Sequence, residues 1–226
     1  MKFDELKERY SGDRAANYDR DRVDSSEWRR EQDTVENFLE AIGLGRGDVV
    51  LDVPVGTGRF LDLYAKHGCH VLGLDISDDM LKQAVTRADQ AQLDADLRVG
   101  DITNIDAADS SAKVVVCVRI FNLLEFTVFR RALAEVARVS DGYVIAGIQI
   151  RRERGSNRSG FSSIPILRKL RVREPRSDQK SRTTSPHPEG RVMQQFRKHG
   201  LTIARQETVV DSSATPYYLY LLRKSS

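Results

Sequence analysis

The sequence predicts an α/β fold, a single domain built on a mostly parallel sheet with helices on both faces. Strand-like apolar runs alternate with stretches whose apolar residues recur at helical spacing. One such run, at residues 48–53, leads directly into a glycine turn that contains Gly56 and Gly58. The length of 226 residues suits one domain with a substantial core.

The order of the elements follows from the same periodicities. A first helix is expected at 27–43, where apolar residues recur at helical spacing and Gly43 supplies a stop. Strands are then expected at 48–53, 70–74, 96–99, 113–118 and 142–150, and helices at 58–67, 78–90 and 125–139. A last helix at 188–199 and a strand pair at 201–211 and 217–223 close the domain. Residues 1–26 are polar and are expected to form an N-terminal arm.

The glycine turn and a carboxylate downstream of it indicate a nucleoside-binding site. Gly56 allows a ligand to approach the backbone where a Cβ would clash. Asp75 follows 19 residues later, at the end of the next strand-like run. A carboxylate in that position can accept both hydrogen bonds of a ribose diol. The pattern therefore predicts an adenosine-containing cofactor.

The residues around the turn favour S-adenosylmethionine over NAD. A dinucleotide fingerprint needs a third glycine, so that a pyrophosphate can sit on a helix N-terminus. That glycine is missing after Gly58, where Arg59, Phe60 and Leu61 follow. Asp52 stands just before the turn, where a carboxylate would repel a pyrophosphate but suits a cationic aminoacyl sulfonium.

With these motifs, the chain resembles the class I S-adenosylmethionine-dependent methyltransferases over roughly residues 35–150, and more weakly at its C-terminal end. The resemblance implies a Rossmann-like, seven-stranded sheet with the strand order 3-2-1-4-5-7-6 and a closing antiparallel hairpin. It implies cofactor contacts from Asp52, Pro54, Gly56, Gly58, Asp75, Ile76, Met80, Asp101, Ile102 and Val118. One residue departs from the family pattern: Pro54 replaces the first glycine, which restricts the turn and removes an N–H. We expect the pocket to survive this change.

The end of the fourth strand offers candidates for the acceptor side of the site, because ligands bind at the carboxyl ends of parallel strands. Arg119 and Asn122 are candidates for lining the pocket. The alternative is that Arg119 lies at a solvated strand end and that Asn122 caps a helix. Cys117 is expected to fill the buried strand. No Asp/Asn-Pro-Pro-aromatic motif for methylating a base amine is present, and no proline precedes Cys117 as in enzymes that attack pyrimidine C5.

No general base stands out in the sequence. His187, between two prolines, could deprotonate a hydroxyl near neutral pH, although a lone loop histidine is more often inert. A base is not required where alignment with the reactive sulfonium supplies the acceleration, or where the acceptor is already ionised.

Charge is unevenly distributed, although the net charge is only +3. Residues 1–40 hold 8 Lys/Arg and 12 Asp/Glu, a balance of −4, whereas residues 151–182 hold 11 Lys/Arg and 3 Asp/Glu, a balance of +8. The basic segment lies in an insertion at 151–187. This insertion is open to three interpretations: a solvated segment, a lid over an anionic acceptor, or a surface for RNA, which its few aromatic residues disfavour.

Composition excludes several other classes of protein. Hydrophobic content of 40% and charged content of 31% are typical of a soluble globular protein, and we expect a cytoplasmic one. No apolar run approaches the length of a membrane span, and the charged N-terminus does not resemble a signal peptide. The two cysteines form no disulfide framework, and the four histidines have no metal-ligand spacing.

The sequence therefore predicts a methyltransferase with S-adenosylmethionine as its cofactor and no metal. The expected reaction is O-methylation of a small-molecule or glycan-type acceptor, anionic acceptors included. RNA methylation through the basic segment and a non-catalytic, cofactor-binding scaffold remain as alternatives.

Overall fold

A computed structural model describes residues 3–152 and 184–225 of the chain. Its helices are α1 (Phe3–Arg9), α2 (Asp13–Ala16), α3 (Ser26–Ala41), α4 (Leu61–His67), α5 (Asp78–Gln90), α6 (Phe126–Val139) and α7 (Glu189–Lys198), with a 3₁₀ turn η1 at Phe121–Leu123. Its strands are β1 (Val49–Asp52), β2 (His70–Asp75), β3 (Ala95–Val99), β4 (Ala112–Cys117), β5 (Ser140–Arg151), β6 (His187–Pro188), β7 (Leu201–Val210) and β8 (Tyr217–Lys224). Residues 153–183, which are most of the basic insertion at 151–187, therefore lie outside the described residues.

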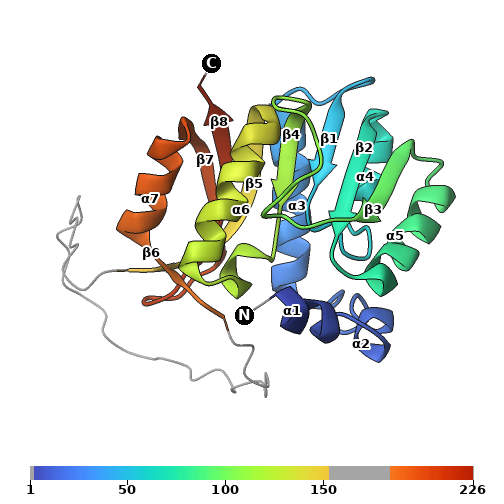
Figure 1. Ribbon diagram of the computed structural model, residues 1–226, viewed down its shortest axis with the longest axis horizontal. Coiled ribbons are helices and arrows are strands. Elements are labelled where there is room, and N and C mark those ends of the chain that lie inside the picture. The colour runs from blue at the N-terminus through green and yellow to red at the C-terminus, as the bar shows by residue number, and fades with distance from the viewer. Residues whose placement is uncertain (1–2, 153–183, 226) are drawn as a thin grey trace, which may run out of the picture.

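The strands form one sheet in the order β3-β2-β1-β4-β5-β8-β7 (Figure 1). The first five of these strands are parallel, and β8 runs antiparallel to both β5 and β7. This is the predicted order, because β8 and β7 occupy the places of the seventh and sixth strands. The predicted number of strands is wrong by one. The additional strand is the two-residue β6, which pairs with the end of β5.

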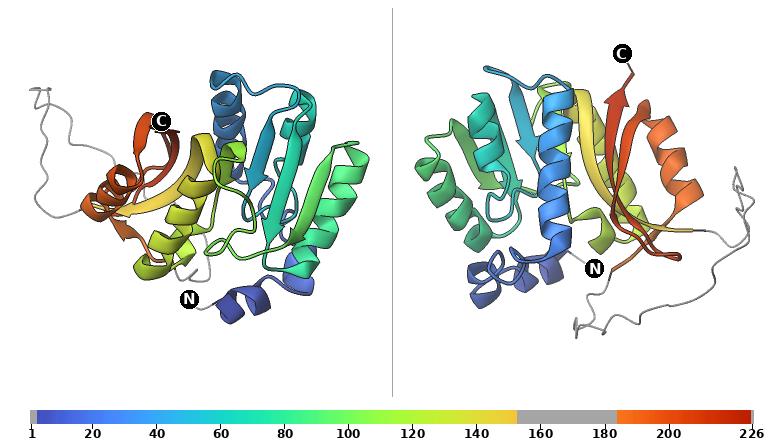
Figure 2. Two further views of the ribbon diagram at one scale, coloured as in Figure 1. Left: turned by 45° about the horizontal axis from the view of Figure 1, so that its top comes forward. Right: turned by 180° about the vertical axis from the view of Figure 1, so that it is seen from behind.

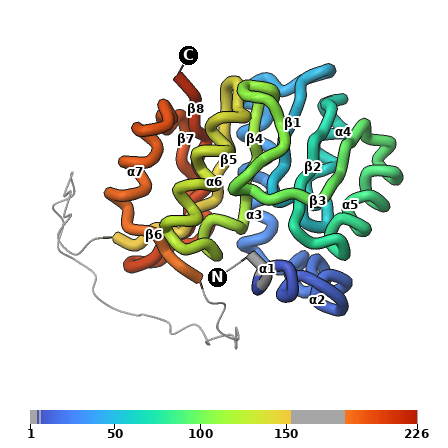
Figure 3. The backbone as a smooth tube through the Cα atoms, viewed as in Figure 1, coloured from blue at the N-terminus to red at the C-terminus, as the bar shows by residue number. Residues whose placement is uncertain are grey.

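Helices cover both faces of the sheet, as the smooth trace in Figure 3 also shows. Successive residues of a strand point to opposite faces. Val115 and Cys117 pack into the core beneath α6 and α7, whereas Val114 and Val116 pack into the core beneath α3, α4 and α5. The view from behind in Figure 2 shows α3 lying across the second face. Burial on both faces explains why the central strands are almost continuously apolar.

Local signals in the sequence account for the helix boundaries next to the site. Ser25 caps α3, where its Oγ accepts a hydrogen bond from Trp28 N at 3.1 Å. Ser77 caps α5 in the same way, with its Oγ accepting from Met80 N at 3.3 Å. Helix α4 ends at Gly68, whose positive φ of 68° is a conformation that glycine adopts without strain. Helices α3 and α5 both begin near the carboxyl edge of the sheet, where Trp28 and Met80 line the same pocket.

The N-terminal arm contains two short helices, α1 and α2, which the polar composition did not predict. The arm is anchored to the turns at the carboxyl ends of β1 and β2. Ser77 Oγ donates to Tyr10 O at 2.6 Å, and Gly12 N donates to Asp79 Oδ2 at 2.9 Å. Asp19 accepts hydrogen bonds from Thr57 Oγ1 and from the Arg87 guanidinium, at 2.7 and 2.9 Å. The arm therefore covers this edge, as Figure 1 shows for α1 and α2.

Candidate functional site

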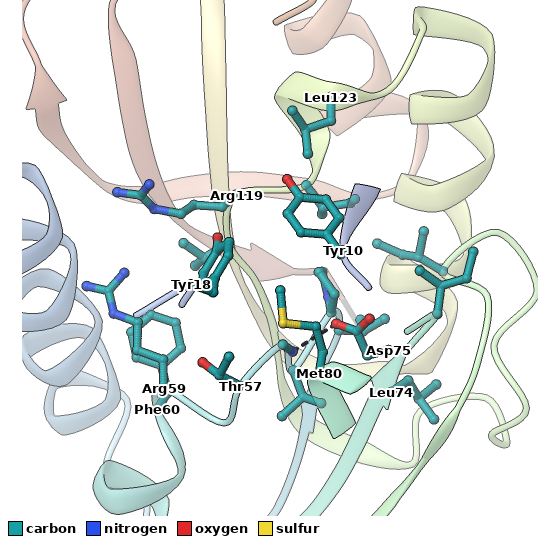
Figure 4. A pocket seen from close by; sticks show the side chains of 18 of the residues that line it. Tyr10, Tyr18, Thr57, Arg59, Phe60, Leu74, Asp75, Met80, Arg119 and Leu123 are labelled. Carbon is teal, nitrogen blue, oxygen red and sulfur yellow. Dashed lines mark hydrogen bonds between the residues drawn. The ribbon is translucent and has the colours of Figure 1, made fainter. Parts of the chain in front are cut away.

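A pocket opens at the carboxyl ends of β1, β2 and β4 (Figure 4). Its walls come from the turn after β1, the residues after β2, β3 and β4, the η1 turn and the N-terminal arm. Its empty volume is about 900 Å³ when the space open to solvent is counted. A pocket assembled from so many chain segments suits an elongated ligand that contacts each segment in turn.

The two motif glycines have different roles in the turn after β1. Gly56 lines the pocket with φ at 57°, and a Cβ built there would meet no atom within 4 Å. The absent side chain leaves room for a ligand next to the backbone. Gly58 is not among the lining residues. A Cβ there would lie 2.6 Å from Leu61 Cδ1 and 3.0 Å from Ala84 Cα, so Gly58 permits close packing of α4 against α5.

Asp75 lies at the pocket wall where the ribose was predicted. Its Oδ2 accepts a hydrogen bond from Gly56 N at 2.9 Å, and its Oδ1 accepts one from Ser77 N at 2.8 Å. Each carboxylate oxygen has two lone pairs, so each retains one for a further donor. Burial raises the pKa of Asp75 to about 6, although backbone hydrogen bonds oppose the shift. The geometry fits a ribose diol that donates to both oxygens.

Asp52 does not face the pocket, contrary to the expectation that it would adjoin a sulfonium. Its side chain is buried below the turn, where Tyr64 OH donates to Oδ2 at 3.0 Å. Burial raises the pKa of Asp52 to about 8. Asp52 therefore supports the turn from beneath through its hydrogen bond with Tyr64. Asp52 therefore does not adjoin the expected position of the sulfonium, and its charge does not favour S-adenosylmethionine over NAD through a direct contact.

The predicted adenine side of the pocket is apolar. Ile76, Met80 and Ile102 line it, together with Gly100, which the motif analysis did not single out as a contact. Asp101 is not among the lining residues. Its Oδ1 accepts hydrogen bonds from Thr103 N and Thr103 Oγ1, at 2.6 and 2.8 Å. Asp101 thus holds the local turn, and the adenine contact expected of it stays a prediction.

The end of β4 supplies the opposite wall. Val118, Arg119 and Ile120 line the pocket there, and Pro54 lines it from the turn after β1. Asn122 lies one turn further on, and it is not a lining residue. Its side-chain Oδ1 is buried without a hydrogen-bond partner among the described residues.

His187 is also placed away from the pocket. It is 2% exposed, its Nε2 lies 2.8 Å from Phe121 O, and its ring packs against Phe126 and Phe129. Burial lowers the pKa of His187, so the ring is neutral at physiological pH. The structure therefore places His187 in the packing of β6 against η1, away from the pocket.

The aromatic side chains of the N-terminal region form much of the remaining wall. Tyr10 and Tyr18 line the pocket, and their rings meet edge to face with centroids 5.9 Å apart. Trp28 lies next to Tyr18, at a centroid distance of 6.2 Å. The arm and the start of α3 therefore both contribute aromatic rings to the pocket wall.

A buried cluster of charges joins Glu31, Arg59 and Arg119. The Glu31 side chain is fully buried on α3, and its Oε2 accepts hydrogen bonds from Arg59 Nη1 at 2.7 Å and from Arg119 Nε at 2.6 Å. The Arg59 guanidinium also stacks 3.6 Å from the centroid of the Trp28 ring. Sequence reasoning missed this cluster. The available signal was Glu31 itself, a carboxylate at helical spacing with the apolar positions 28, 35 and 38.

The residues fit S-adenosylmethionine even though Asp52, Gly58 and Asp101 lie outside the pocket. Gly56 offers open backbone, Asp75 offers unused carboxylate lone pairs, and the wall beyond Asp75 is apolar.

Among the described residues, no group of three or more His, Cys, Asp or Glu side chains could hold a metal ion. No helix in the described ranges is long and apolar enough to cross a membrane.

Comparisons with known proteins agree with the domain type. Residues 50–141 match a family model described as a methyltransferase domain. A demethylmenaquinone methyltransferase of Renibacterium salmoninarum is 37% identical over 102 residues, which are 45% of this chain and 40% of that protein. A ubiquinone biosynthesis O-methyltransferase of Coxiella burnetii is 31% identical over 75 residues, 33% of this chain and 32% of that protein. The chain thus spans less than half the length of these two relatives.

A solved structure extends the likeness to the whole fold. Magnesium protoporphyrin IX methyltransferase from Synechocystis PCC 6803, with bound S-adenosylmethionine, aligns with a TM-score of 0.73 at 15% identity, over 99% of this chain and 97% of that one. At this identity the likeness concerns the fold. The predicted class I methyltransferase fold is confirmed by this likeness.

Proposed function

We propose that this chain, which carries a class I S-adenosylmethionine-dependent methyltransferase domain, transfers the methyl group to an oxygen of a small-molecule acceptor. The observation that carries the proposal is one continuous pocket with two unlike parts. Asp75 and Gly56 present polar groups suited to a nucleoside, and Tyr10, Tyr18 and Trp28 form an aromatic chamber beside them. The first part suits the cofactor, and the second suits a compact, largely apolar acceptor.

Each wall has a separate task in the proposed reaction. Asp75 accepts hydrogen bonds from the ribose hydroxyls, while Ile76 and Ile102 enclose the adenine. The bound cofactor supplies an electrophilic methyl group on a sulfonium. The aromatic chamber excludes water and aligns the acceptor oxygen with the S–CH₃ bond; that bond breaks as the O–CH₃ bond forms, and S-adenosylhomocysteine leaves. Alignment of this kind can supply much of the acceleration.

Among the described residues that line the pocket there is no histidine and no lysine. An acceptor oxygen that is already ionised needs no base, which is consistent with this wall. Of the two alternatives, RNA methylation depends on a basic segment that mostly lies outside the described residues. The non-catalytic scaffold requires that cofactor binding occur without turnover, and direct measurement separates it from an enzyme.

The first experiment is a calorimetric titration of the protein with S-adenosylmethionine, S-adenosylhomocysteine and NAD. We expect micromolar binding of the first two and none of NAD. The matched variants are Asp75→Ala and Asp89→Ala, since Asp89 is an exposed carboxylate on α5 outside the pocket. Loss of binding in both variants, or binding of NAD alone, would contradict the proposal.

The second experiment follows methyl transfer from labelled S-adenosylmethionine to a panel of hydroxylated and carboxylated aromatic compounds and to RNA. We expect incorporation into at least one small acceptor and none into RNA. Incorporation into RNA, with steep salt dependence, would replace the proposed acceptor class. Cofactor binding without transfer to any acceptor would favour the scaffold.

A further inference from the structure

Arg119 occupies an unusual place in the pocket wall. It is the second residue after β4, and its backbone adopts a positive φ of 65°, which is uncommon for a residue with a side chain. Such conformations concentrate at functional sites, where the surrounding structure maintains them. In Figure 4 the side chains of Arg119 and Arg59 lie on one side of the pocket, and Asp75 and Leu74 lie on the other. Arg119 is therefore at the end away from the ribose position.

The two arginines differ in how fully their hydrogen-bonding capacity is used. Arg59 donates from Nε to Gln32 Oε1 at 3.1 Å, from Nη1 to Glu31 at 2.7 Å and from Nη2 to Trp28 O, so all three nitrogens are engaged. Arg119 donates from Nε to Glu31 Oε2. Its two terminal nitrogens have no hydrogen-bond partner within the described ranges. Arg119 is 19% exposed at the pocket wall, so those nitrogens are the unused donors of the cluster.

The charges of this wall do not cancel. Glu31 is one carboxylate shared by two guanidinium groups, which leaves an excess positive charge in a partly buried place. The cofactor adds to it, because its sulfonium and ammonium outweigh its single carboxylate. An ionised Asp75 balances only one of these charges. A cationic acceptor would meet unfavourable electrostatics here, and an anionic acceptor would relieve them.

The rest of the acceptor side is apolar or aromatic. The Arg119 guanidinium lies 5.4 Å from the centroid of the Trp28 ring, and Tyr18 and Ile120 also line the pocket. An apolar wall with one cationic donor pair recognises a molecule with an apolar body and one anionic group. The planar guanidinium matches the planar carboxylate, with which it can form two parallel hydrogen bonds.

We infer that the methyl acceptor is an apolar, ring-sized carboxylic acid whose carboxylate pairs with the terminal nitrogens of Arg119. This inference rests on the proposed function and narrows it to one class of substrate. Glu31 acts as the positioning residue, because it holds Nε and thereby directs the remaining two nitrogens. Arg59 holds Glu31 in place and braces Trp28. Arg119 determines specificity by rejecting neutral and cationic analogues of the acid.

The test measures binding to protein saturated with S-adenosylhomocysteine, with 2-naphthoate as the acid and 2-naphthamide as its neutral counterpart. The wild-type protein is expected to bind the acid about 10- to 100-fold more tightly than the amide, the range for a hydrogen bond to a charged group. Arg119→Gln should abolish this preference and leave the affinity for S-adenosylhomocysteine within about twofold. Arg131→Gln, which changes an exposed arginine of α6, should retain the preference.

Each other outcome overturns the inference. Equal affinities of the wild-type protein for acid and amide would remove the anion requirement. A loss of S-adenosylhomocysteine affinity in Arg119→Gln as large as its loss of acid affinity would assign Arg119 to the carboxylate of the cofactor.

Two controls accompany these measurements. Thermal melting of Arg119→Gln checks its fold, and Arg119→Lys, which keeps the charge, should recover part of the preference for the acid. Failure of the wild-type protein to bind S-adenosylhomocysteine would contradict the proposed function itself, and is thereby distinguished from failure of this inference alone.

Discussion

The backbone N–H of Gly56 donates a 2.9 Å hydrogen bond to Oδ2 of Asp75, and this bond joins the two parts of the cofactor motif. The residues are 19 positions apart and lie at the ends of neighbouring parallel strands. The hydrogen bond orients the carboxylate and fixes the turn against the second strand. The Asp75 carboxylate and the open backbone at Gly56 are therefore a single unit, and a change in either residue affects both.

Replacing Asp75 with alanine should weaken S-adenosylmethionine binding by about 1.5–3 kcal/mol, the usual value for hydrogen bonds to a charged group. The loss arises because both ribose hydroxyls and the Gly56 N–H lose their acceptor. Isothermal titration calorimetry measures it, with Asp89→Ala as the exposed control. An unchanged dissociation constant would show that Asp75 does not hold the ribose.

Cofactor affinity should depend on pH through Asp75. Burial raises its pKa to about 6, and only the ionised carboxylate can accept from both hydroxyls while it retains the two backbone hydrogen bonds. We therefore expect affinity to fall as the pH drops below about 6. Asp75→Asn should bind more weakly and lose this pH dependence. A wild-type profile that is flat between about pH 5 and 8 would contradict the assignment.

The stability of the cofactor-free protein should decrease with rising pH because of Asp52. Burial raises its folded-state pKa to about 8, above the unfolded value of 3.8, so the native state binds more protons between these values. Stability is then highest near the acid end of this window and falls as the pH rises toward about 8. Asp52→Asn, which keeps the size and an acceptor for Tyr64, should make this slope shallower by about 1 kcal/mol per pH unit. Urea unfolding at several pH values measures it, and equal slopes in both proteins would refute the prediction.

Alanine substitutions at the two glycines should separate folding from binding. Gly58→Ala combines a φ of 80° with a Cβ only 2.6 Å from Leu61 Cδ1, so it should destabilise the fold by about 2–4 kcal/mol. Gly56→Ala has open space around the new Cβ and should cost only about 1–2 kcal/mol of stability. Gly56→Ala should nevertheless lose more cofactor affinity than Gly58→Ala for each kcal/mol of stability that it loses. Chemical denaturation and calorimetry on the same preparations give both quantities.

The N-terminal arm should contribute to binding through its anchors. Removing residues 1–22 is expected to leave the sheet folded and to weaken cofactor or acceptor binding, because Tyr10 and Tyr18 line the pocket. Asp19→Ala tests the same point with a single change, since Asp19 ties the arm to Thr57 and Arg87. Asp21→Ala is the control, because the Asp21 side chain is exposed and, within the described part of the chain, forms only a 4.0 Å ion pair with its neighbour Arg20. Equal affinities in the truncated and full-length proteins would show that the arm has no part in binding.

The sequence alone predicted the parts of this protein that depend on local patterns. The central helices and strands lie within a few residues of their predicted bounds, since each follows from hydrophobic periodicity and a nearby cap. The link between Gly56 and Asp75 could be predicted because consecutive parallel strands bring their carboxyl ends together. Of the predicted cofactor contacts, seven line the pocket: Pro54, Gly56, Asp75, Ile76, Met80, Ile102 and Val118.

Tertiary structure decided the direction in which each polar side chain points. Whether Asp52 faces a ligand or Tyr64, and whether Asp101 faces adenine or Thr103, depends on packing that the spacing of residues does not contain. The cluster of Glu31, Arg59 and Arg119 joins residues 28 and 88 positions apart. No local signal links such distant positions, because they meet only after α3 has packed across the sheet. The fold and the cofactor could therefore be predicted from local sequence. The chemistry of the wall around Glu31, Arg59 and Arg119 depends on long-range packing.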